Sequence, residues 1–468
     1  MRGISQLSLG LVAALAARAH AACTGLLQLE AEDAVLSGTE VLTELAGYSG
    51  SGYVGGFDES ADKITFTVEV TEEKLYDLTI RYAGIYGAKR ATVTLNSGIS
   101  FEVPFEETTS WETASGGQVL LSKGENTIQI VNNWGWYLID YVALKPSAAR
   151  ADHQITDTLV NPDADANAYT LYRYLKSIYG KKILSGQQDL TWADYAANKA
   201  GKYPALLSVD LMDYSPSRVE RGTVGTSMED AIAHHNKGGI VSVLWHWNAP
   251  TGLYDTEEHK WWSGFYTDAT DFDIDAALSD TTNANYTLII RDIDAIAVQL
   301  KKLETAGVPV LFRPLHEAEG AWFWWGAKGP APCLKLWKLL HDRLTGHHGI
   351  NNLIWVWNSI SADWYPGDDS VDIVSADVYS QGNGPMAIEY DQVIALGKDT
   401  KMAAATEVGA APLPSLLQAY QAHWLYFCVW GDSFINNDDW NSAATLTEIY
   451  NDEYVLTLDE IQRWQDSV

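Results

Sequence analysis

Leu311-Phe-Arg-Pro-Leu-His-Glu317 begins as an apolar run and ends in two polar side chains. Ala403-Ala-Ala-Thr-Glu407 has the same form, and six further strand-like runs lie in the same part of the chain. Amphipathic segments alternate with these runs, which is typical of parallel βα units. Eight strands close a (β/α)8 TIM barrel, in which the side chains that end the strands gather at one face. We therefore expect an α/β barrel in which Glu317 and Glu407 face one cleft.

The predicted barrel strands are residues 182–187, 205–210, 240–247, 308–317, 353–358, 372–379, 402–407 and 424–430. Predicted helices between them include residues 286–305, 333–344 and 415–422. A doubly wound open sheet is the main alternative. It is less favoured, because the first βα turn has no Gly-rich phosphate loop.

The front of the chain has a different pattern. Residues 64–70 alternate apolar and polar side chains with period two, as do residues 76–82, 91–95 and 126–131. Turns rich in Gly and Ser separate these runs, and no helix-like period appears, which indicates an all-β sandwich. A chain of 468 residues is also long enough for two domains. We predict a jelly-roll-like sandwich over residues 23–145, a linker over residues 146–154 and the barrel over residues 155–468.

The composition excludes some partners. The chain has 31 Lys and Arg against 61 Asp and Glu, a formal net charge of −30, which opposes binding to nucleic acid or anionic lipid. The 19 Trp and 24 Tyr suit a different partner, because many of the Trp stand beside Gly, Asn or Asp and flat aromatic side chains can stack on sugars. The alternative is that these rings pack the cores. We expect a neutral polysaccharide partner, no nucleic acid or membrane partner, and a monomer.

Residues 1–22 resemble a processing segment. An arginine precedes the apolar run Leu7 to Ala17, and Ala19-His-Ala21 is a small-x-small cleavage signal, so we predict a signal peptide and a secreted, extracellular protein. No later run approaches the ~20 apolar residues of a membrane span. Asn285-Tyr-Thr287 is a glycosylation sequon that fits secretion.

The cysteines Cys23, Cys333 and Cys428 are too few for a disulfide scaffold. At most one bridge can form among them. A bridge between Cys333 and Cys428 is one option, and nothing in the sequence supports it.

Two glutamates at strand ends suit one chemistry. Splitting a glycosidic bond needs one carboxyl group that is protonated and another that is ionised. Glu317 and Glu407 can supply both without a metal or cofactor. A single strand-end glutamate more often caps a helix or binds a cation, but two, each surrounded by aromatic residues, favour the catalytic interpretation.

The segment Arg313-Pro-Leu-His-Glu-Ala-Glu-Gly-Ala-Trp322 resembles the acid/base motif of glycoside hydrolase family 26, a β-mannanase family with catalytic glutamates on strands four and seven. The His before the Glu is the specific feature, because most related families have Asn there. Four more motifs match in order, so the resemblance covers Asp157 to Val468. They are residues 244–250, 375–379, 406–407 and 429–432.

This resemblance implies an endo-β-1,4-mannanase that acts by a retaining double displacement, with Glu317 as general acid/base and Glu407 as nucleophile. It also implies that Tyr379 hydrogen-bonds the nucleophile and that His246 and His316 contact the sugar at the cleavage point. Trp430 should lie under that sugar, and Trp322 should lie beside the leaving group. Asp377 should be a sugar ligand or a supporting neighbour. Gly431 departs from the charged residue that some members have after Trp430.

Lys260-Trp261-Trp262-Ser-Gly-Phe265 lies in the long connection after the third predicted strand. This connection belongs to the catalytic face of a barrel. We hypothesise that Trp261 and Trp262, together with Phe265, stack sugars several units from the cleavage point. The alternative is that they pack the loop against the barrel.

The front part resembles a carbohydrate-binding module of family 35 in Leu29-Glu-Ala-Glu32, in residues 47–54 and in residues 132–141. The resemblance implies a structural Ca²⁺ held by Glu30, Glu32 and Asp140, whose hard oxygen ligands suit that ion. Trp134 and Trp136 stand in a Gly-containing turn, and at least one of them should be a sugar-binding platform.

Two other functions remain open from the sequence. Family 26 also includes mixed-linkage β-glucanases and β-1,3-xylanases, which share the catalytic motif. A non-catalytic, lectin-like barrel is less favoured, because such a barrel should lack Glu317 or Glu407.

Overall fold

The computed structural model describes residues 19–20, 25–96, 98, 100–461 and 464–466. Apart from Ala19 and His20, the predicted signal peptide lies outside the described residues, as does Cys23. The chain forms two compact units, Met1–Ala149 and Arg150–Val468. The division falls inside the predicted linker, residues 146–154.

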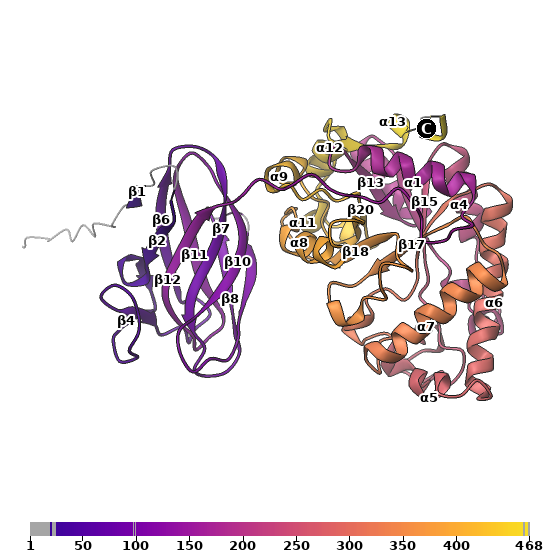
Figure 1. Cartoon of the computed structure of the whole chain (residues 1–468), viewed down its shortest axis with the longest axis horizontal. Coiled ribbons are helices and arrows are strands. Elements are labelled where there is room, and N and C mark those ends of the chain that lie inside the picture. Colours follow the sequence, from indigo (N-terminus) through magenta and orange to yellow (C-terminus); the bar gives the residue numbers. More distant parts are fainter. Residues whose placement is uncertain (1–18, 21–24, 97, 99, 462–463, 467–468) are drawn as a thin grey trace, which may run out of the picture. The chain divides into compact units, whose positions relative to one another are not determined.

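The front unit consists of two sheets (Figure 1). One has the order β1-β6-β11-β8-β9 with β3 beside β6, and the other has the order β10-β7-β12-β5-β4 with β2 beside β12. The strands are β1 (Ala19–His20), β2 (Leu27–Glu30), β3 (Val35–Ser37), β4 (Glu40–Leu42), β5 (Tyr53–Gly55), β6 (Lys63–Val70), β7 (Lys74–Ala83), β8 (Lys89–Leu95), β9 (Ser100–Phe105), β10 (Glu112–Leu121), β11 (Gly124–Trp134) and β12 (Leu138–Pro146).

The core of this unit lies between the two sheets. Strand β6 shows how the sequence places it: Ile64, Phe66, Val68 and Val70 are buried, while the residues between them are partly exposed. Successive side chains of a strand point to opposite faces, so the alternating sequence covers the core on one face only. The predicted β-sandwich is confirmed.

In the second unit, eight parallel strands form a closed barrel in the order β14-β15-β16-β17-β18-β19-β20-β13. Pairing between β13 and β14 closes it. The strands are β13 (Ile183–Gln188), β14 (Leu206–Asp210), β15 (Ile240–Leu244), β16 (Val310–Arg313), β17 (Leu353–Asn358), β18 (Ile373–Val378), β19 (Met402–Val408) and β20 (Tyr426–Val429), and the two-residue β21 (Val455–Leu456) pairs with β13. The predicted TIM barrel is confirmed, and the open-sheet alternative is wrong.

Helices surround this barrel (Figure 1). They are α1 (Ala166–Ile178), α2 (Leu190–Ala200), α3 (Pro216–Val219), α4 (Ser227–Asn236), α5 (Ile274–Leu278), α6 (Ala284–Thr305), α7 (Pro330–Asp342), α8 (Ala387–Leu396), α9 (Pro414–Tyr420), α10 (Ser433–Asn436), α11 (Asp438–Asn441), α12 (Ala443–Asn451) and α13 (Leu458–Ile461). The three helices expected from the sequence correspond to α6, α7 and α9, with ends shifted by at most three residues.

One apolar cluster fills the interior of the barrel, and Leu206, Leu311 and Met402 belong to it. Cys333 and Cys428 are buried and free, so the bridge considered between them does not form. Among the described residues, no helix is both long and apolar enough to cross a membrane.

Candidate active site

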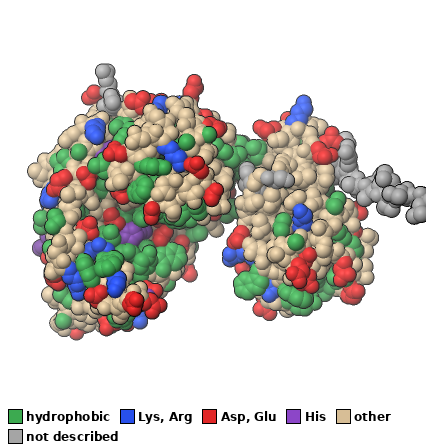
Figure 2. Space-filling view, turned by 180° about the vertical axis from the view of Figure 1, so that it is seen from behind, with side chains coloured by type: hydrophobic (Ala, Val, Ile, Leu, Met, Phe, Trp, Pro, Cys, Tyr) green, Lys and Arg blue, Asp and Glu red, His purple; other side chains and the backbone are tan. Residues whose placement is uncertain are grey.

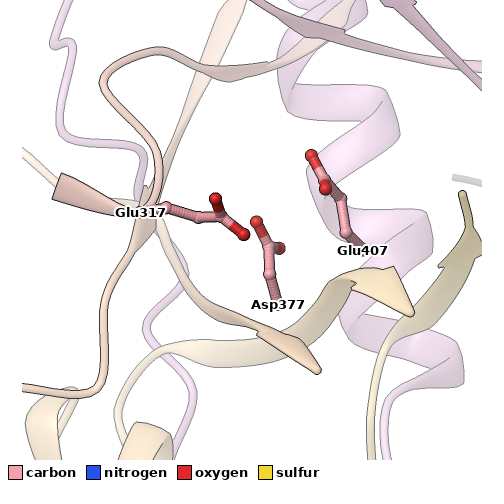
Figure 3. A group of neighbouring side chains, drawn as sticks. All are labelled: Glu317, Asp377 and Glu407. Carbon is pink, nitrogen blue, oxygen red and sulfur yellow. The ribbon is translucent and has the colours of Figure 1, made fainter. Parts of the chain in front are cut away.

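Three carboxylates meet at the ends of the barrel strands. Glu317 follows β16, Asp377 lies on β18 and Glu407 lies on β19. One oxygen of each carboxylate lies within 4.8 Å of one oxygen of the other two, and the side chains point towards a shared space (Figure 3). The structure therefore brings together the two glutamates that the sequence singled out, with Asp377 beside them.

An irregularity between two strands places Asp377 and Glu407. The pairing of β18 with β19 shifts register between Ala376 and Asp377, and this shift sets Asp377 opposite Glu407. Bulges of this kind re-aim side chains and are common beside active sites. The pairing of β19 with β20 also shifts after Ala405, so the chain around Glu407 departs from regular sheet on both sides.

The backbone at Glu317 is strained. Leu315 has φ 54° and Glu317 has φ 53°, in the left-handed region that side-chain-bearing residues rarely occupy. Asn358 Oδ1 accepts a hydrogen bond from the backbone N–H of Glu317 at 2.8 Å, and Trp325 Nε1 donates to the carbonyl of His316 at 2.9 Å. Strain of this kind persists only where surrounding contacts hold it, and it clusters at functional sites. This turn also ends β16 at Arg313, four residues before the predicted end at Glu317.

Arg313 lies between two of the carboxylates. It is 1% exposed and donates hydrogen bonds to Asp377, at 2.8 Å, and to Glu407. Burial by itself lowers the pKa of Arg313, but the negative charges of Asp377 and Glu407 raise it above its ordinary value. Arg313 therefore joins Asp377 and Glu407 through two buried ion pairs.

Tyr379 donates a hydrogen bond from its hydroxyl to Glu407 Oε2 at 2.6 Å, the contact that the resemblance implied. Burial and the charge of Glu407 raise the pKa of Tyr379, so the phenol keeps its proton and remains a donor. Glu407 is itself buried, with 3% exposed. Its two oxygens thus accept from one charged and one neutral donor, which fixes the orientation of the carboxylate.

Glu317 has a different environment. Burial raises the pKa of Glu317, and the charge of Glu407 raises it further. The indole N–H of Trp322 donates to Glu317 Oε2 at 2.9 Å, which opposes this shift without cancelling it. Glu317 is therefore held towards its protonated form, which is the state that the acid in the cleavage of a glycosidic bond needs.

Asp377 is enclosed rather than open. Its side chain is 2% exposed, and besides Arg313 it accepts hydrogen bonds from Asn358 Nδ2 at 2.9 Å and Thr406 Oγ1 at 2.7 Å. Burial raises the pKa of Asp377 well above its ordinary value. Of the two roles considered from the sequence, this position favours the supporting neighbour over the sugar ligand.

Two histidines meet beside the carboxylates. His246 Nδ1 lies 2.6 Å from Asp210 Oδ2, and its Nε2 lies 3.2 Å from His316 Nε2. Burial alone lowers the pKa of His246, but Asp210 outweighs burial and raises it, whereas burial lowers the pKa of His316 well below its ordinary value. Of the two rings, His246 therefore favours the protonated form and His316 favours the neutral form.

Aromatic rings line the space around these groups. Trp430 and Phe265 pack against His246, with ring centroids 5.9 and 5.1 Å away, and Trp322 is 48% exposed beside Glu317. Phe265 also contacts Tyr266 and Phe323. It therefore lies at the wall of the central site, and the interpretation that it stacks a distant sugar is not favoured. Figure 2 shows histidine side chains in a hollow of the barrel unit, bordered by hydrophobic ones.

Trp261 and Trp262 stand farther out on the connection that follows β15. Their rings contact edge-to-face at 5.6 Å, and Trp262 is 48% exposed. Arg221 lies over the ring of Trp261 at 5.4 Å, while Asn248 Nδ2 donates to the backbone carbonyl of Trp261 and Arg218 to that of Trp262. The loop is thus fixed by its backbone, which leaves the Trp262 ring available on the surface.

Three residues of the site were not assigned roles from the sequence: Arg313, Asn358 and Asp210. A signal existed for Arg313, because a charged residue inside an apolar strand is rarely buried without a partner. Asp210 and Asn358 each end a predicted strand, which was a signal for both, but their partners are 36 and 41 residues away in the chain.

The predicted calcium ligands of the front unit are only partly brought together. Ser49 Oγ donates to Glu30 Oε2 at 2.6 Å and lies 3.3 Å from Asp140 Oδ2, so Glu30 and Asp140 share one neighbour. Ser51 N donates to Glu32 Oε1, and the other oxygen of Glu32 is buried with no partner among the described residues. Asp140 is also ion-paired with Arg81. The calcium site of Glu30, Glu32 and Asp140 stays a prediction.

Trp134 and Trp136 are 65% and 58% exposed. The turn between them is tight, because a Cβ on Gly135 would lie 2.0 Å from the carbonyl oxygen of Phe57, and Trp136 has φ 67°. Tyr86 meets the Trp136 ring edge-on at 6.4 Å, and Lys89 lies over Trp134 at 5.5 Å. Both rings are therefore held at the surface, outside the core of the sandwich.

The family model for glycosyl hydrolase family 26 matches residues 160–460, which include every catalytic-site residue described above. The chain belongs to glycoside hydrolase family 26. The model for the family 35 carbohydrate-binding module matches residues 27–147, so this family 26 chain carries such a module in front of its barrel. The motif with His316 before Glu317 was thus a correct indication of the family.

Relatives of this family 26 chain agree along its length. It is 70% identical over 438 residues to the mannan endo-1,4-β-mannosidase of Thermothelomyces thermophilus, covering 94% of this chain and 91% of that one. The mannan endo-1,4-β-mannosidase A of a Piromyces species is 36% identical over 446 residues, with 92% and 72% covered. The crystal structure of the Podospora anserina GH26-CBM35 β-(1,4)-mannanase has 67% identity and a TM-score of 0.72, with 94% and 99% covered.

The contact between Trp322 and Glu317 predicts a change in pH dependence. Trp322→Phe removes an N–H that stabilises the Glu317 carboxylate, so the pKa of Glu317 should rise. The alkaline limb of kcat/KM, where Glu317 must stay protonated, should then move to higher pH by up to about one unit, since a neutral hydrogen bond is worth ~1 kcal/mol. The measurement is a pH profile on soluble mannan. Trp261→Phe is the matched control, and a limb that stays in place or moves to lower pH in Trp322→Phe contradicts this role.

Proposed function

We propose that this chain is a secreted endo-β-1,4-mannanase that hydrolyses internal bonds of β-mannan by a retaining double displacement. The separation of the two glutamates carries the mechanism, because their nearest oxygens lie within 4.8 Å. Retaining glycosidases hold their carboxyl groups about 5–5.5 Å apart, whereas inverting enzymes leave about 6.5–9.5 Å for a water molecule. The substrate follows from the relatives, which are named mannan endo-1,4-β-mannosidases. These names also favour mannan over the glucan and xylan alternatives.

In the first step, an oxygen of Glu407 attacks the anomeric carbon of the sugar while the bond to the leaving oxygen breaks. Glu317 gives its proton to that oxygen, so the leaving chain departs as an alcohol. Its raised pKa keeps this proton in place until the bond begins to break. Arg313 and Tyr379 hold Glu407 ionised and aimed, and both are already in position in this structure.

In the second step, Glu317 is ionised and accepts a proton from water. The water oxygen attacks the anomeric carbon, the bond to Glu407 breaks, and both carboxyl groups return to their starting states. Two inversions give net retention. Trp430 and His246 line the position of the reacting sugar, and Trp322 contacts Glu317 from the side on which the leaving group must lie. Because one chain supplies all these groups, we expect a monomer to be active.

We propose that the front unit holds the enzyme on polysaccharide through Trp134 and Trp136. Two exposed indole rings on a rigid turn offer apolar faces at little entropic cost. We also propose that Glu30 and Glu32 hold a structural Ca²⁺, because the buried, unpartnered Oε2 of Glu32 is a hard oxygen without a donor.

The two catalytic glutamates should differ in their dependence on the leaving group. Glu317→Ala should lower turnover of mannan by about 10²- to 10⁴-fold, but should spare aryl mannosides with good leaving groups, which need no proton. Glu407→Ala should lose activity on both, because no covalent intermediate can form. Azide should rescue Glu407→Ala and give an α-linked mannosyl azide, identified by NMR. A β-linked product from that variant would reverse the two assignments.

Trp262 should matter only for long substrates. Trp262→Ala should lower kcat/KM on mannohexaose by up to about tenfold, since stacking on an aromatic face contributes about 0.5–1.5 kcal/mol, and should leave mannotriose unchanged. Trp261→Ala is the matched control and should have the smaller effect, because Arg221 covers that ring. Equal losses on both oligomers at an unchanged melting temperature would rule out a distant subsite. A lowered melting temperature would indicate packing instead.

The module should affect how much enzyme stays bound to insoluble mannan, and not how fast the enzyme hydrolyses soluble mannan. The double variant Trp134→Ala/Trp136→Ala should bind less to insoluble mannan in a pull-down assay, with hydrolysis of soluble mannan unchanged. Leu26→Ala is the control, because Leu26 is 63% exposed in the same unit and lies in no aromatic cluster. Full retention by the double variant would place the binding surface elsewhere.

Calcium should stabilise the front unit only. Chelation should lower the melting temperature of that unit and leave turnover unchanged, because a ligand that binds the folded state shifts its stability. Glu32→Gln should remove this sensitivity while keeping the shape of the side chain. The measurement is calorimetry with and without EDTA, and a calcium response that survives in Glu32→Gln contradicts the ligand assignment.

A further inference from the structure

Glu319 lies two residues after the acid/base Glu317, in the turn that follows β16, and no step of the reaction involves it. The turn forms a short 3-10 helix over Ala318–Gly320, and Glu319 is half-buried. The residues at both ends of this helix, Glu317 and Ala321, have positive φ, of 53° and 58°. A turn with strained ends keeps its shape only where other contacts hold it.

The carboxylate of Glu319 joins this turn to the loop that follows β17. The backbone N–H of Ile360 donates to Glu319 Oε1 at 3.2 Å, and that of Ser361 donates to Oε2 at 2.9 Å. The Ser359 hydroxyl also donates to Oε2. Hydrogen bonds to an ionised carboxylate are roughly twice as strong as those between neutral groups. Glu319 therefore holds three successive loop residues and is not a freely moving surface carboxylate.

The same loop begins at Asn358, which holds the backbone of Glu317. Asn358 Oδ1 accepts a hydrogen bond from the N–H of Glu317 at 2.8 Å, and Asn358 Nδ2 donates to Asp377 at 2.9 Å. Glu317 and Glu319 thus contact consecutive positions of one loop, at Asn358 and at residues 359–361. A single attachment would let the turn pivot about Asn358. The second attachment, through Glu319, fixes its direction as well.

The turn also sets the position of the Trp322 indole. A Cβ on Gly320, the residue after Glu319, would lie 2.0 Å from Trp322 Cζ3, so the ring lies directly over this glycine. The same ring donates from Nε1 to Glu317 Oε2 at 2.9 Å. A shift of the turn would therefore move the Glu317 carboxyl group and the indole that contacts it together.

We infer that Glu319 is a positioning residue for the general acid/base, because it holds the turn that aims the Glu317 carboxyl group at the leaving oxygen. The inference rests on the proposed function and deepens it. A proton donor must lie within about 2.6–3.2 Å of the atom that it protonates, and a misplacement of about 1 Å can lower the rate ~10²-fold. Loss of Glu319 should therefore impair proton transfer to the leaving oxygen and spare the attack by Glu407.

The test compares two substrates that differ only in their need for a proton, phenyl β-mannobioside and 2,4-dinitrophenyl β-mannobioside. Glu319→Ala should lower kcat/KM on the phenyl substrate by about ten- to hundredfold, and on the dinitrophenyl substrate by less than about twofold. The ratio kcat/KM reports the first bond cleavage, so the later role of Glu317 as a base does not enter. Glu319→Gln keeps one acceptor oxygen and should lose about three- to tenfold on the phenyl substrate.

Glu317→Ala in the same assay separates this inference from the proposed function. An equal loss on both substrates in Glu317→Ala would contradict the acid itself, and the positioning role would fail with it. A selective loss in Glu317→Ala but not in Glu319→Ala would overturn the positioning role alone. The double variant Glu317→Ala/Glu319→Ala should lose no more on the phenyl substrate than Glu317→Ala, because no proton donor remains to be aimed. A further loss there would show that Glu319 acts by another route.

Glu304→Ala is the matched control. The Glu304 side chain is 20% exposed and accepts a hydrogen bond from the backbone N–H of Asn351 at 2.8 Å, but it joins the end of α6 to the segment before β17, at the opposite ends of the strands. Its loss should lower the melting temperature and leave kcat/KM on both substrates within about twofold of the wild type. Equal losses on the two substrates in Glu319→Ala and in Glu319→Gln, which keeps the side-chain volume, would indicate general packing and overturn the inference.

Discussion

The ion pairs of Arg313 hold this active site together. A guanidinium that is 1% exposed donates to both Asp377 and Glu407. Removing one partner of a buried pair leaves an uncompensated charge, which is strongly destabilising. Arg313 also fixes the position of the Glu407 carboxylate before substrate arrives. The position of Arg313 also explains why β16 carries a charge within an otherwise apolar strand.

The same surroundings also shift the pKa values of neighbouring titratable groups. Burial raises the pKa of Glu317, and the charge of Glu407 raises it further. Burial lowers the pKa of His316, whereas at His246 the charge of Asp210 outweighs burial and raises the pKa. Both histidines are buried, so the charged neighbour on the other nitrogen of His246 separates their pKa values.

Asp140 in the front unit is another buried carboxylate whose charge an arginine balances. It is fully buried and paired with Arg81, and it also accepts a hydrogen bond from the Ser49 hydroxyl that donates to Glu30. In the barrel, the absence of a side chain at Gly431 leaves room that Trp192 of α2 fills. In both places a residue remote in sequence supplies what the local motif does not.

The sequence by itself determined the two folds, the family and the placement of Glu317 and Glu407 in one site, because alternating burial and the strand-end position of these two residues are local properties of the chain. The runs predicted for β17 and α6 match within two residues for the same reason. Only the tertiary structure decided the roles of Arg313, Asn358 and Asp210, the enclosure of Asp377 and the pairing of Asp140. Those contacts join residues 19 to 94 positions apart. Their energies depend on burial and on charged neighbours, which exist only once the barrel and the sandwich have closed.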